Sequence, residues 1–321
     1  MHRYLIGIDV GGTNIKMMIM DEGYGVIAET SVPTMAELGY EAISDRMLLE
    51  LDGMFAERGI ETPAVAAVGM GLPGTVDKRS NRTVYLAKLR WDGFNPAEKI
   101  GRHYHAPSFI DNDANINALG EYQFGTEKKA DSLALLTLGT GVGCGLVVNG
   151  RIFGGAANMA GEAGHMIVSA EGGAICLCGR RGHLEGYCSG TALERSAKEM
   201  LAARPESLLA GYVKENHGVY DNRMIPRGVC EKDEVCLELW ERYVHYLSVG
   251  IANIMTMYNP EVILLGGGIS GAGELLLEPV NQKTAKMVLC ERSWCPVKGA
   301  ALGARAGMYG ACALAGQEVG L

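Results

Sequence analysis

Two segments of the chain share one pattern, in which an apolar run leads into a glycine-rich turn and a second apolar run leads out. The first segment, residues 4–20, turns at Gly11, and the second, residues 132–148, turns at Gly139, which lies 128 positions further on. Apolar runs joined by glycine turns are typical of β-hairpins. Two similar hairpins at this separation indicate two related half-domains, although glycine-rich hairpins also resemble one another by chance.

Strands and helices alternate around these hairpins, which predicts an α/β protein. The predicted strands are 64–70, 107–110 and 261–265, and the predicted helices are 40–57, 114–124, 191–203, 231–258 and a closing helix at 299–313. The uncharged stretch 132–150 contains five glycines and breaks into two short apolar runs. We therefore expect it to be a buried hairpin and not a transmembrane helix.

The composition narrows the class of protein. Glycine accounts for 45 of the 321 residues, about twice the usual ~7%, and its clustering indicates turns that approach another group closely. Hydrophobic residues at 48% and charged residues at 21% exclude a disordered chain. The net charge of −8 argues against binding nucleic acid through bulk electrostatics. Nine cysteines without a signal peptide predict a cytoplasmic protein with free or metal-bound thiols.

The glycine turns do not match the common nucleotide motifs. The chain has no G-x-x-x-x-G-K-[ST] loop, and the glycines after Gly139 lead into residues of strand type instead of a helix. What remains is a turn whose backbone N–H groups face a phosphate. Asp9 precedes the first turn by two residues, and its carboxylate would repel phosphate unless Mg²⁺ lay between them. Each turn alone is only a tight hairpin, whereas the pair predicts a phosphate clamp.

A second constellation combines two thiols and two imidazoles. Cys176, Cys178 and His183 form a C-x-C-x4-H pattern, and His165 lies eleven residues upstream. Four such ligands match tetrahedral Zn²⁺ with no position left for water, which is typical of a structural site. The alternative interpretation is a pair of buried thiols with two surface histidines.

Asp113 is the candidate catalytic carboxylate. It lies where a predicted strand ends and a predicted helix begins, and ligands of open α/β sheets bind outside the carboxyl ends of the strands. A carboxylate there can accept a proton from a reacting hydroxyl. Asp and Asn are also favoured helix N-caps, and the local sequence by itself favours that structural role.

Taken together, these motifs make a family resemblance visible. Residues 6–13 resemble the first phosphate motif of the actin/hexokinase/Hsp70 fold, 138–143 resemble the second, and 266–268 resemble its adenosine-side glycine motif. Within that fold, 161–185 are similar to the signature of the ROK family of sugar kinases and repressors. The resemblance spans about residues 5–306. It implies an α/β, two-lobed actin-like ATPase (ribonuclease H-like) fold with duplicated half-domains and a sugar and nucleotide cleft between the lobes. The lobes are expected at 1–112, completed by a C-terminal helix at about 305–321, and at 113–304.

The resemblance also implies an activity, an ATP-dependent phosphorylation of a hexose 6-hydroxyl, most simply that of glucose, with Asp113 as the general base. The sugar-binding residues it implies are Gly71, Asn112, Asp113, Glu162, His165 and Glu185. The residues implied for ATP and Mg²⁺ are Asp9, Gly11, Gly12, Thr13, Asn14, Lys16, Gly139, Thr140, Gly141, Gly266, Gly267 and Gly268. Structural Zn²⁺ would be held by His165, Cys176, Cys178 and His183.

Two departures from the family pattern leave the substrate open. His183 stands where a third cysteine is usual, and Lys88 stands where asparagine is usual. Glucose, N-acetylmannosamine, N-acetylglucosamine, allose and fructose all stay possible, as does polyphosphate in place of ATP. The expected partners are a sugar, ATP and a second copy of the chain in a homodimer, with no nucleic acid and no membrane.

Two alternatives belong to other functional classes. A sugar-responsive repressor would carry a DNA-binding module before the first phosphate motif. Here that motif begins at Leu5, which leaves no room for a helix-turn-helix and argues against a repressor. A sugar sensor without activity is the second alternative. The presence of Asp9 and Asp113 together with the glycine motifs argues against it.

Overall fold

The computed structural model describes residues 3–61, 63–86, 89–125 and 130–321, so the departure at Lys88 lies outside the described residues. Contacts divide the chain into two units. Unit 1 comprises 1–130, 145–161 and 301–321, and unit 2 comprises 131–144 and 162–300. The lobe boundaries expected from the sequence stay a prediction, because these units are defined by packing alone.

Unit 1 is built on a five-stranded sheet in the order β3-β2-β1-β4-β7. The five strands of this sheet are β1 (Arg3–Val10), β2 (Asn14–Asp21), β3 (Val26–Pro33), β4 (Ala64–Leu72) and β7 (Ser108–Asn112). Unit 1 also contains the paired strands β5 (Thr75–Asp77) and β6 (Arg82–Tyr85), and β10 (Arg151–Ile152), which belongs to the second sheet. Its α-helices are α1 (Gly39–Ala56), α2 (Glu98–His103), α3 (Asp113–Phe124) and α10 (Ala306–Glu318). Strands β1 to β3 pair antiparallel, whereas β4 is parallel to both β1 and β7.

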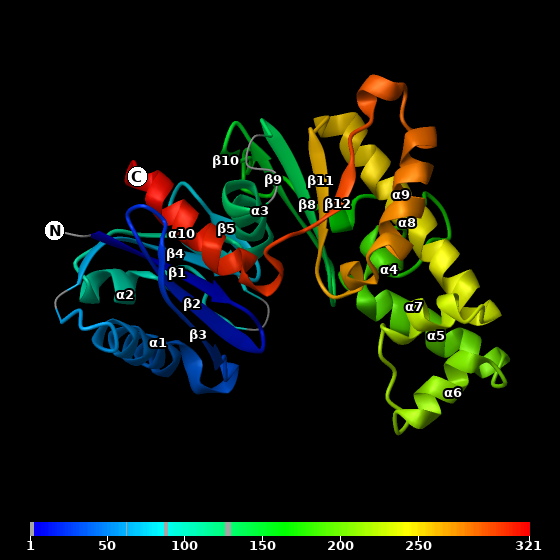
Figure 1. The fold of residues 1–321 in the computed structure, drawn as a ribbon, viewed down its shortest axis with the longest axis horizontal. Coiled ribbons are helices and arrows are strands. Elements are labelled where there is room, and N and C mark those ends of the chain that lie inside the picture. Colours follow the sequence, from blue (N-terminus) through cyan, green and yellow to red (C-terminus); the bar gives the residue numbers. More distant parts are fainter. Residues whose placement is uncertain (1–2, 62, 87–88, 126–129) are drawn as a thin grey trace. The chain divides into compact units, whose positions relative to one another are not determined.

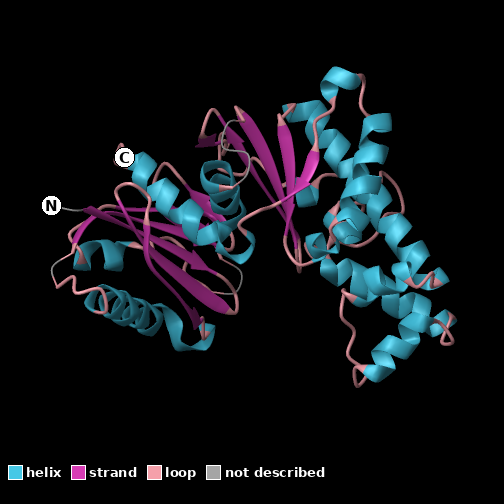
Figure 2. Ribbon diagram, viewed as in Figure 1, coloured by secondary structure: helices cyan, strands magenta, loops and turns pink. Residues whose placement is uncertain are grey.

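The second five-stranded sheet has the order β10-β9-β8-β11-β12. Its remaining strands are β8 (Ser132–Leu138), β9 (Val142–Val148), β11 (Val262–Gly266) and β12 (Val297–Gly299). The helices of unit 2 are α4 (Glu185–Cys188), α5 (Gly190–Ala203), α6 (Leu208–Glu215), α7 (Met224–Cys230), α8 (Glu234–Tyr258) and α9 (Glu274–Met287). Each sheet adds parallel strands beside the first strand of a hairpin, as Figure 2 shows. This repeated order confirms the predicted α/β fold with duplicated halves.

The first sheet buries both of its faces, because successive side chains of a strand point to opposite sides. Ile6 and Ile8 belong to the core that also contains the buried side chains of α1, whereas Leu5 packs with those of α10. Figure 1 accordingly shows α1 on one side of this sheet and α10 on the other. The predicted closing helix therefore completes the sheet packing of unit 1.

Glycines allow α10 to approach its neighbours at backbone distance. A Cβ at Gly69 of β4 would overlap the carbonyl oxygen of Ala311, and a Cβ at Gly7 of β1 would lie 2.5 Å from the carbonyl oxygen of Met308. A Cβ at Gly310 of α10 would overlap the carbonyl oxygen of Ile116 in α3. Several of the excess glycines therefore serve close packing between elements and not ligand binding.

We expect Gly310→Ala to lower the free energy of unfolding by about 2–3 kcal/mol, since a backbone oxygen occupies the space of the added methyl and overpacked sites cost amounts of this order. Gly53→Ala is the matched control. Gly53 lies on the exposed side of α1 with no atom within 4 Å of its Cβ position, so alanine there should stabilise the helix by ~0.5–1 kcal/mol. Urea denaturation of both variants measures the difference. Equal midpoints would contradict the close packing of α3 and α10.

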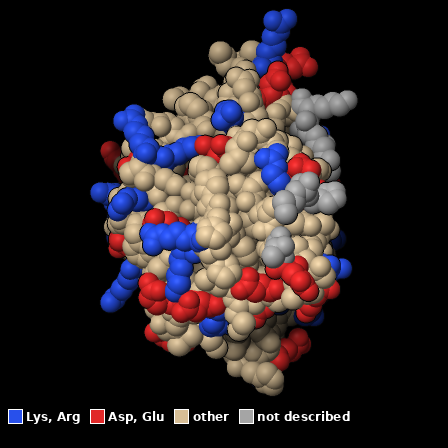
Figure 3. Space-filling model, turned by 90° about the vertical axis from the view of Figure 1, so that its left-hand side faces the viewer, with Lys and Arg blue, Asp and Glu red and all other residues tan. Residues whose placement is uncertain are grey.

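The structure confirms the hairpin predicted for 132–150, which forms β8 and β9. In the described part of the chain, no helix is long and apolar enough to cross a membrane. The closing helix begins at Ala306, later than the predicted 299, because Val297–Gly299 pair with β11 as strand β12. Figure 3 shows Lys and Arg side chains interspersed with Asp and Glu over one face of the molecule.

Candidate active site and metal centre

Three neighbouring strands of unit 1 bring two predicted site residues, Asp9 and Gly71, into one row with Asp111. In the pairing register, Asp9 of β1 lies opposite Gly71 of β4, and Gly71 lies opposite Asp111 of β7. These residues stand near the carboxyl ends of parallel strands, where ligands bind in α/β sheets. Asp113 follows Asp111 by two residues. Sequence positions up to about 100 residues apart therefore meet at one edge of the sheet.

Asp113 is the first residue of α3, and its neighbour Asn112 caps the helix. The Asn112 Oδ1 accepts hydrogen bonds from the backbone N–H groups of Ala114 (2.8 Å) and Asn115 (3.2 Å). Its Nδ2 donates to the Gly74 carbonyl (3.0 Å), which fixes the amide between helix and turn. The structural role that the local sequence favours for this motif is thus present at Asn112, and it leaves Asp113 at the positive end of the helix dipole, where a carboxylate is stabilised.

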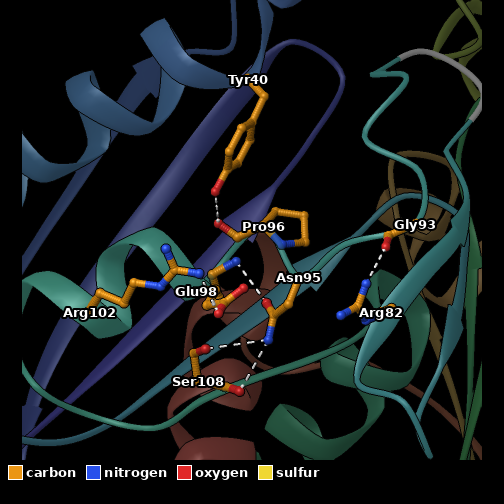
Figure 4. Close-up of polar contacts among 9 residues, drawn as sticks. Tyr40, Arg82, Gly93, Asn95, Pro96, Glu98, Arg102 and Ser108 are labelled. Atoms are coloured by element: carbon orange, nitrogen blue, oxygen red, sulfur yellow. Dashed lines mark hydrogen bonds and ion pairs between the residues drawn. The ribbon is translucent and has the colours of Figure 1, made fainter.

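Strand β7, which leads to Asn112 and Asp113, is held at its first residue by the preceding segment around Asn95 (Figure 4). The Asn95 Nδ2 donates to both the carbonyl oxygen and the hydroxyl of Ser108, each at 3.3 Å. Pro96, which follows Asn95, is also held in place, because its carbonyl oxygen accepts a hydrogen bond from the Tyr40 hydroxyl (3.1 Å). Ser108 begins β7, so these contacts fix the start of the strand whose end carries Asp111.

Asp9 and the first glycine turn lie at the start of α10. A Cβ at Gly307 would overlap the Asp9 carboxylate, so the helix approaches the carboxylate closely. Burial raises the pKa of Asp9, and the Lys16 ammonium, 3.9 Å from Asp9 Oδ2, partly opposes that rise. The turn itself closes with a hydrogen bond from the Gly11 N–H to the Asn14 carbonyl (2.9 Å). Carboxylates are typical ligands of Mg²⁺, so Asp9 is the side chain beside this turn that could hold such an ion.

The second glycine turn lies beside a cavity of about 610 Å³ within unit 2. The predicted residues that line it are Gly139, Thr140 and Gly268, whereas Gly141, Gly266 and Gly267 are absent from its lining. Gly267 instead packs on β8, where its Cβ would lie 2.5 Å from the Leu138 carbonyl oxygen, and it has a φ of 86°. A side chain there would therefore be strained and would clash. The cavity is large enough for a nucleoside.

His165, Cys176, Cys178 and His183 form one cluster, in which the four ligand atoms all lie within 4.8 Å of one another. The Nδ1 of His165 is 3.6 Å from Cys176 Sγ, and the Nδ1 of His183 is 3.4 Å from Cys178 Sγ. Tetrahedral Zn²⁺ with ordinary bond lengths separates S and N ligands by about 3.6 Å. Burial and the nearby His165 lower the pKa of His183, which favours the neutral imidazole that binds metal. The cluster is consistent with a zinc site.

The predicted sugar ligands of unit 2 surround this cluster. Glu162 Oε2 lies 4.0 Å from the Nε2 of His165, the ring nitrogen that points away from Cys176. Glu185 is buried, with Oε1 3.1 Å from Cys176 Sγ and Oε2 accepting a hydrogen bond from the Val142 N–H (3.1 Å). The structure therefore groups Glu162, His165 and Glu185 in unit 2, while Gly71, Asn112 and Asp113 belong to unit 1.

Several residues near these sites were missed from the sequence. Asn158 is buried with a φ of 55°, and its Nδ2 donates to Asp111 Oδ1 (3.1 Å) and to the Val76 carbonyl (3.2 Å). It thereby ties the segment before Glu162 to the strand before Asp113. Leu138, from the predicted second phosphate motif, also lines the cavity of unit 2. The lining residues that were not predicted are Glu194, Tyr220, Asp221, Asn222, Arg223, Pro226, Ile269, Gly271 and Ala272. No local pattern marks these residues, because they come from three separate segments.

Comparison with known proteins identifies relatives of this chain. The sequence profile of the ROK family matches residues 5–318. A glucokinase of Halalkalibacterium halodurans is 36% identical over 280 residues, which are 87% of this chain and 84% of that protein. The crystal structure of a ROK family glucokinase from Streptomyces griseus, in complex with glucose and AMPPNP, has a TM-score of 0.79 and 30% identity, covering 98% of this chain and 99% of that one. A xylose repressor of Caldicellulosiruptor bescii is 29% identical over 87% of this chain and 69% of its own length.

The two α/β units with their paired glycine turns define the actin-like ATPase class. Within that class, the chain belongs to the ROK family. Its relatives include both a glucokinase and a xylose repressor, so family membership does not by itself assign an activity.

Proposed function

We propose that the protein is an ATP-dependent hexose kinase that transfers the γ-phosphate to the 6-hydroxyl, with glucose as the expected substrate. The observation that carries this proposal is the position of Asp113, which begins α3 directly after the row of strand ends that holds Asp9. A nucleotide-sized cavity beside the second glycine turn supports it. The similarity to glucokinases at 30–36% identity favours glucose over other hexoses.

In this proposal Asp113 accepts the proton of the attacking hydroxyl as the oxygen approaches the γ-phosphorus. Phosphoryl transfer depends on holding both reactants in line and on neutralising charge. Glu162, His165 and Glu185 would accept or donate hydrogen bonds to the sugar hydroxyls. A site built around such polar groups rejects analogues that lack the matching hydroxyl, because its own polar groups would then stay unpaired.

The phosphates of ATP would be held by backbone N–H groups of the two turns, at Gly11, Gly12 and Thr13 in unit 1 and at Gly139, Thr140 and Gly141 in unit 2. Lys16 and Asn14 flank the first turn, and the residues Gly266, Gly267 and Gly268 are proposed for the adenosine side. Asp9 would hold Mg²⁺, which neutralises phosphate charge when bound. The four cluster residues would hold Zn²⁺, which fixes the loop that carries the sugar ligands.

A coupled ADP-release assay with Mg-ATP and a panel of hexoses and N-acetylhexosamines tests the function. We expect a glucose-dependent rate with kcat/KM above about 10⁴ M⁻¹s⁻¹, the lower end for ordinary enzymes. A clear preference for N-acetylmannosamine or another sugar would keep the mechanism and replace the substrate. Polyphosphate in place of ATP in the same assay identifies the phosphate donor, and sedimentation of the same preparation measures the expected homodimer.

A sugar-sensing regulator is the second candidate, favoured by the similarity to xylose repressors. Such a protein would bind a sugar without releasing ADP. Calorimetric sugar binding combined with no turnover on any sugar of the panel, from protein that contains zinc, would establish the sensor and exclude the kinase.

A further inference from the structure

The segment that follows the metal cluster contacts the second glycine turn at three points, all within unit 2. The hydrogen bonds run from the Val142 N–H to Glu185 Oε2 (3.1 Å), from the Gly190 N–H to the Gly139 carbonyl (2.7 Å) and from the Thr191 hydroxyl to the Thr140 carbonyl (2.9 Å). Glu185 approaches so closely that a Cβ at Gly141 would lie 2.6 Å from its Oε2. One short segment therefore holds two carbonyl groups and one N–H group of this turn.

Helix α5 connects the same turn to the loop of the metal cluster. Arg195 follows Thr191 by four residues, so both side chains lie on one face of the helix. The Arg195 guanidinium donates to the Ile175 carbonyl (3.0 Å) and to the Gly186 carbonyl (2.9 Å). Ile175 directly precedes the metal-cluster residue Cys176. The first two turns of α5 thus contact the glycine turn at one end and the metal loop at the other.

Holding these carbonyls also orients the N–H groups of the turn. In a trans peptide the C=O and the following N–H point in opposite directions within one rigid plane. Thr191 holds the Thr140 carbonyl and so aims the Gly141 N–H, while Gly190 holds the Gly139 carbonyl and so aims the Thr140 N–H. Glycines leave a backbone free to rotate, and the turn has one hydrogen bond of its own, from the Gly139 N–H to the Gly141 carbonyl (3.0 Å). The contacts from Gly190 and Thr191 therefore add to that bond in fixing the orientation of the turn.

We propose that Thr191 and Arg195 are positioning residues that couple the metal loop to the nucleotide half-site of unit 2. Thr191 orients the N–H donors of the glycine turn, and Arg195 ties the same helix to the loop that carries Cys176. Zinc therefore supports nucleotide binding as well as sugar binding. The inference rests on the proposed function, because it takes the turn at Gly139 as a phosphate-binding turn.

Thr191→Val tests the first part, because valine keeps the shape of threonine and removes only the hydroxyl. Loss of one hydrogen bond of this kind corresponds to an affinity change of about three- to tenfold. We expect the Kd for AMPPNP, measured by calorimetry, and the KM for ATP to rise by that factor, with the KM for the sugar and the thermal unfolding temperature unchanged. Thr191→Ser is the matched control, since it retains the hydroxyl and should bind AMPPNP like the wild type.

Removal of zinc tests the coupling. In the wild type, chelation should weaken AMPPNP binding by at least as much as Thr191→Val does. In Thr191→Val, and likewise in Arg195→Met, chelation should weaken it by a smaller factor, because the connection is already broken and coupled sites are not additive. Equal factors in all three proteins would overturn the coupling between the metal loop and the turn.

The outcomes separate this inference from the function on which it rests. Wild-type protein that binds no AMPPNP would overturn the nucleotide assignment and the inference with it. Wild-type protein that binds AMPPNP, together with Thr191→Val protein that binds it equally well, would overturn the role of Thr191 and leave the kinase proposal intact.

Discussion

Replacing Asp113 with asparagine is expected to lower kcat by roughly 10²–10⁴, the usual contribution of a general base. Asparagine has nearly the same shape, and its Oδ1 can still accept the hydrogen bond that Asp113 Oδ1 accepts from the Ala114 N–H at 2.9 Å. It cannot accept a proton at working pH. The loss should therefore fall on kcat, while the KM values for sugar and ATP change by less than about threefold, since only an interaction made in the transition state is removed.

Asp45→Asn provides the control for this prediction. Asp45 is an exposed carboxylate of α1 that pairs with Lys99, and its replacement changes the net charge by the same amount. Its kcat should equal that of the wild type. If Asp113→Asn turned over at a rate within threefold of the wild type, another group would have to accept the hydroxyl proton, and the role proposed for Asp113 would be wrong.

Much of the fold was predictable because the strong elements carry local signals. The hairpin pattern repeated at Gly11 and Gly139 gave the duplication, and both sheets have the order that it implies. Strand β3 was missed because its side chains are only half-buried or exposed and form no apolar run. Helices α6 and α7 were missed because they have only eight and seven residues, too few to show a helical period.

The site was predictable only where its residues are close in sequence or match a motif. Cys176, Cys178 and His183 lie within eight positions, so their spacing alone indicated a metal. The contacts of Thr191 and Arg195 depend on how α5 passes the turn and the loop, which no local pattern encodes. Asn158 gives a weak signal at most, since asparagine tolerates the left-handed backbone conformation it adopts, but the bond to Asp111 requires the folded chain.

The second large effect concerns the metal cluster. We expect Cys178→Ser to lose most of its zinc, because a serine hydroxyl is a far weaker ligand than a thiolate. The loss of affinity should exceed the ~10–100-fold that follows the removal of a group that only supports a ligand. Cys178 is exposed, so its replacement disturbs the packing of unit 2 little. Elemental analysis of the purified protein gives the zinc content per chain.

The same variant should bind sugar more weakly and unfold at a lower temperature. His165 and Glu185 both contact Cys176, so a loop that loses its metal also loses the fixed positions of two proposed sugar ligands. The family pattern supplies a second variant, His183→Cys, which restores the usual third cysteine and should keep its zinc, because thiolate and imidazole are equally competent ligands.

Cys290→Ser is the matched control for this series. Cys290 is also exposed, and it is not among the four residues that form the described cluster, so its replacement should leave zinc content, sugar affinity and unfolding temperature unchanged. Zinc retained at the wild-type level in Cys178→Ser would show that Cys178 is not a ligand that the ion requires, since three protein ligands and a water can also hold zinc. Zinc lost without any change in sugar KM would show that the metal stabilises the loop but does not hold the sugar ligands in place. Only a joint loss of zinc and sugar affinity in Cys178→Ser, absent from both His183→Cys and Cys290→Ser, agrees with a metal that positions Glu185 and His165 for binding.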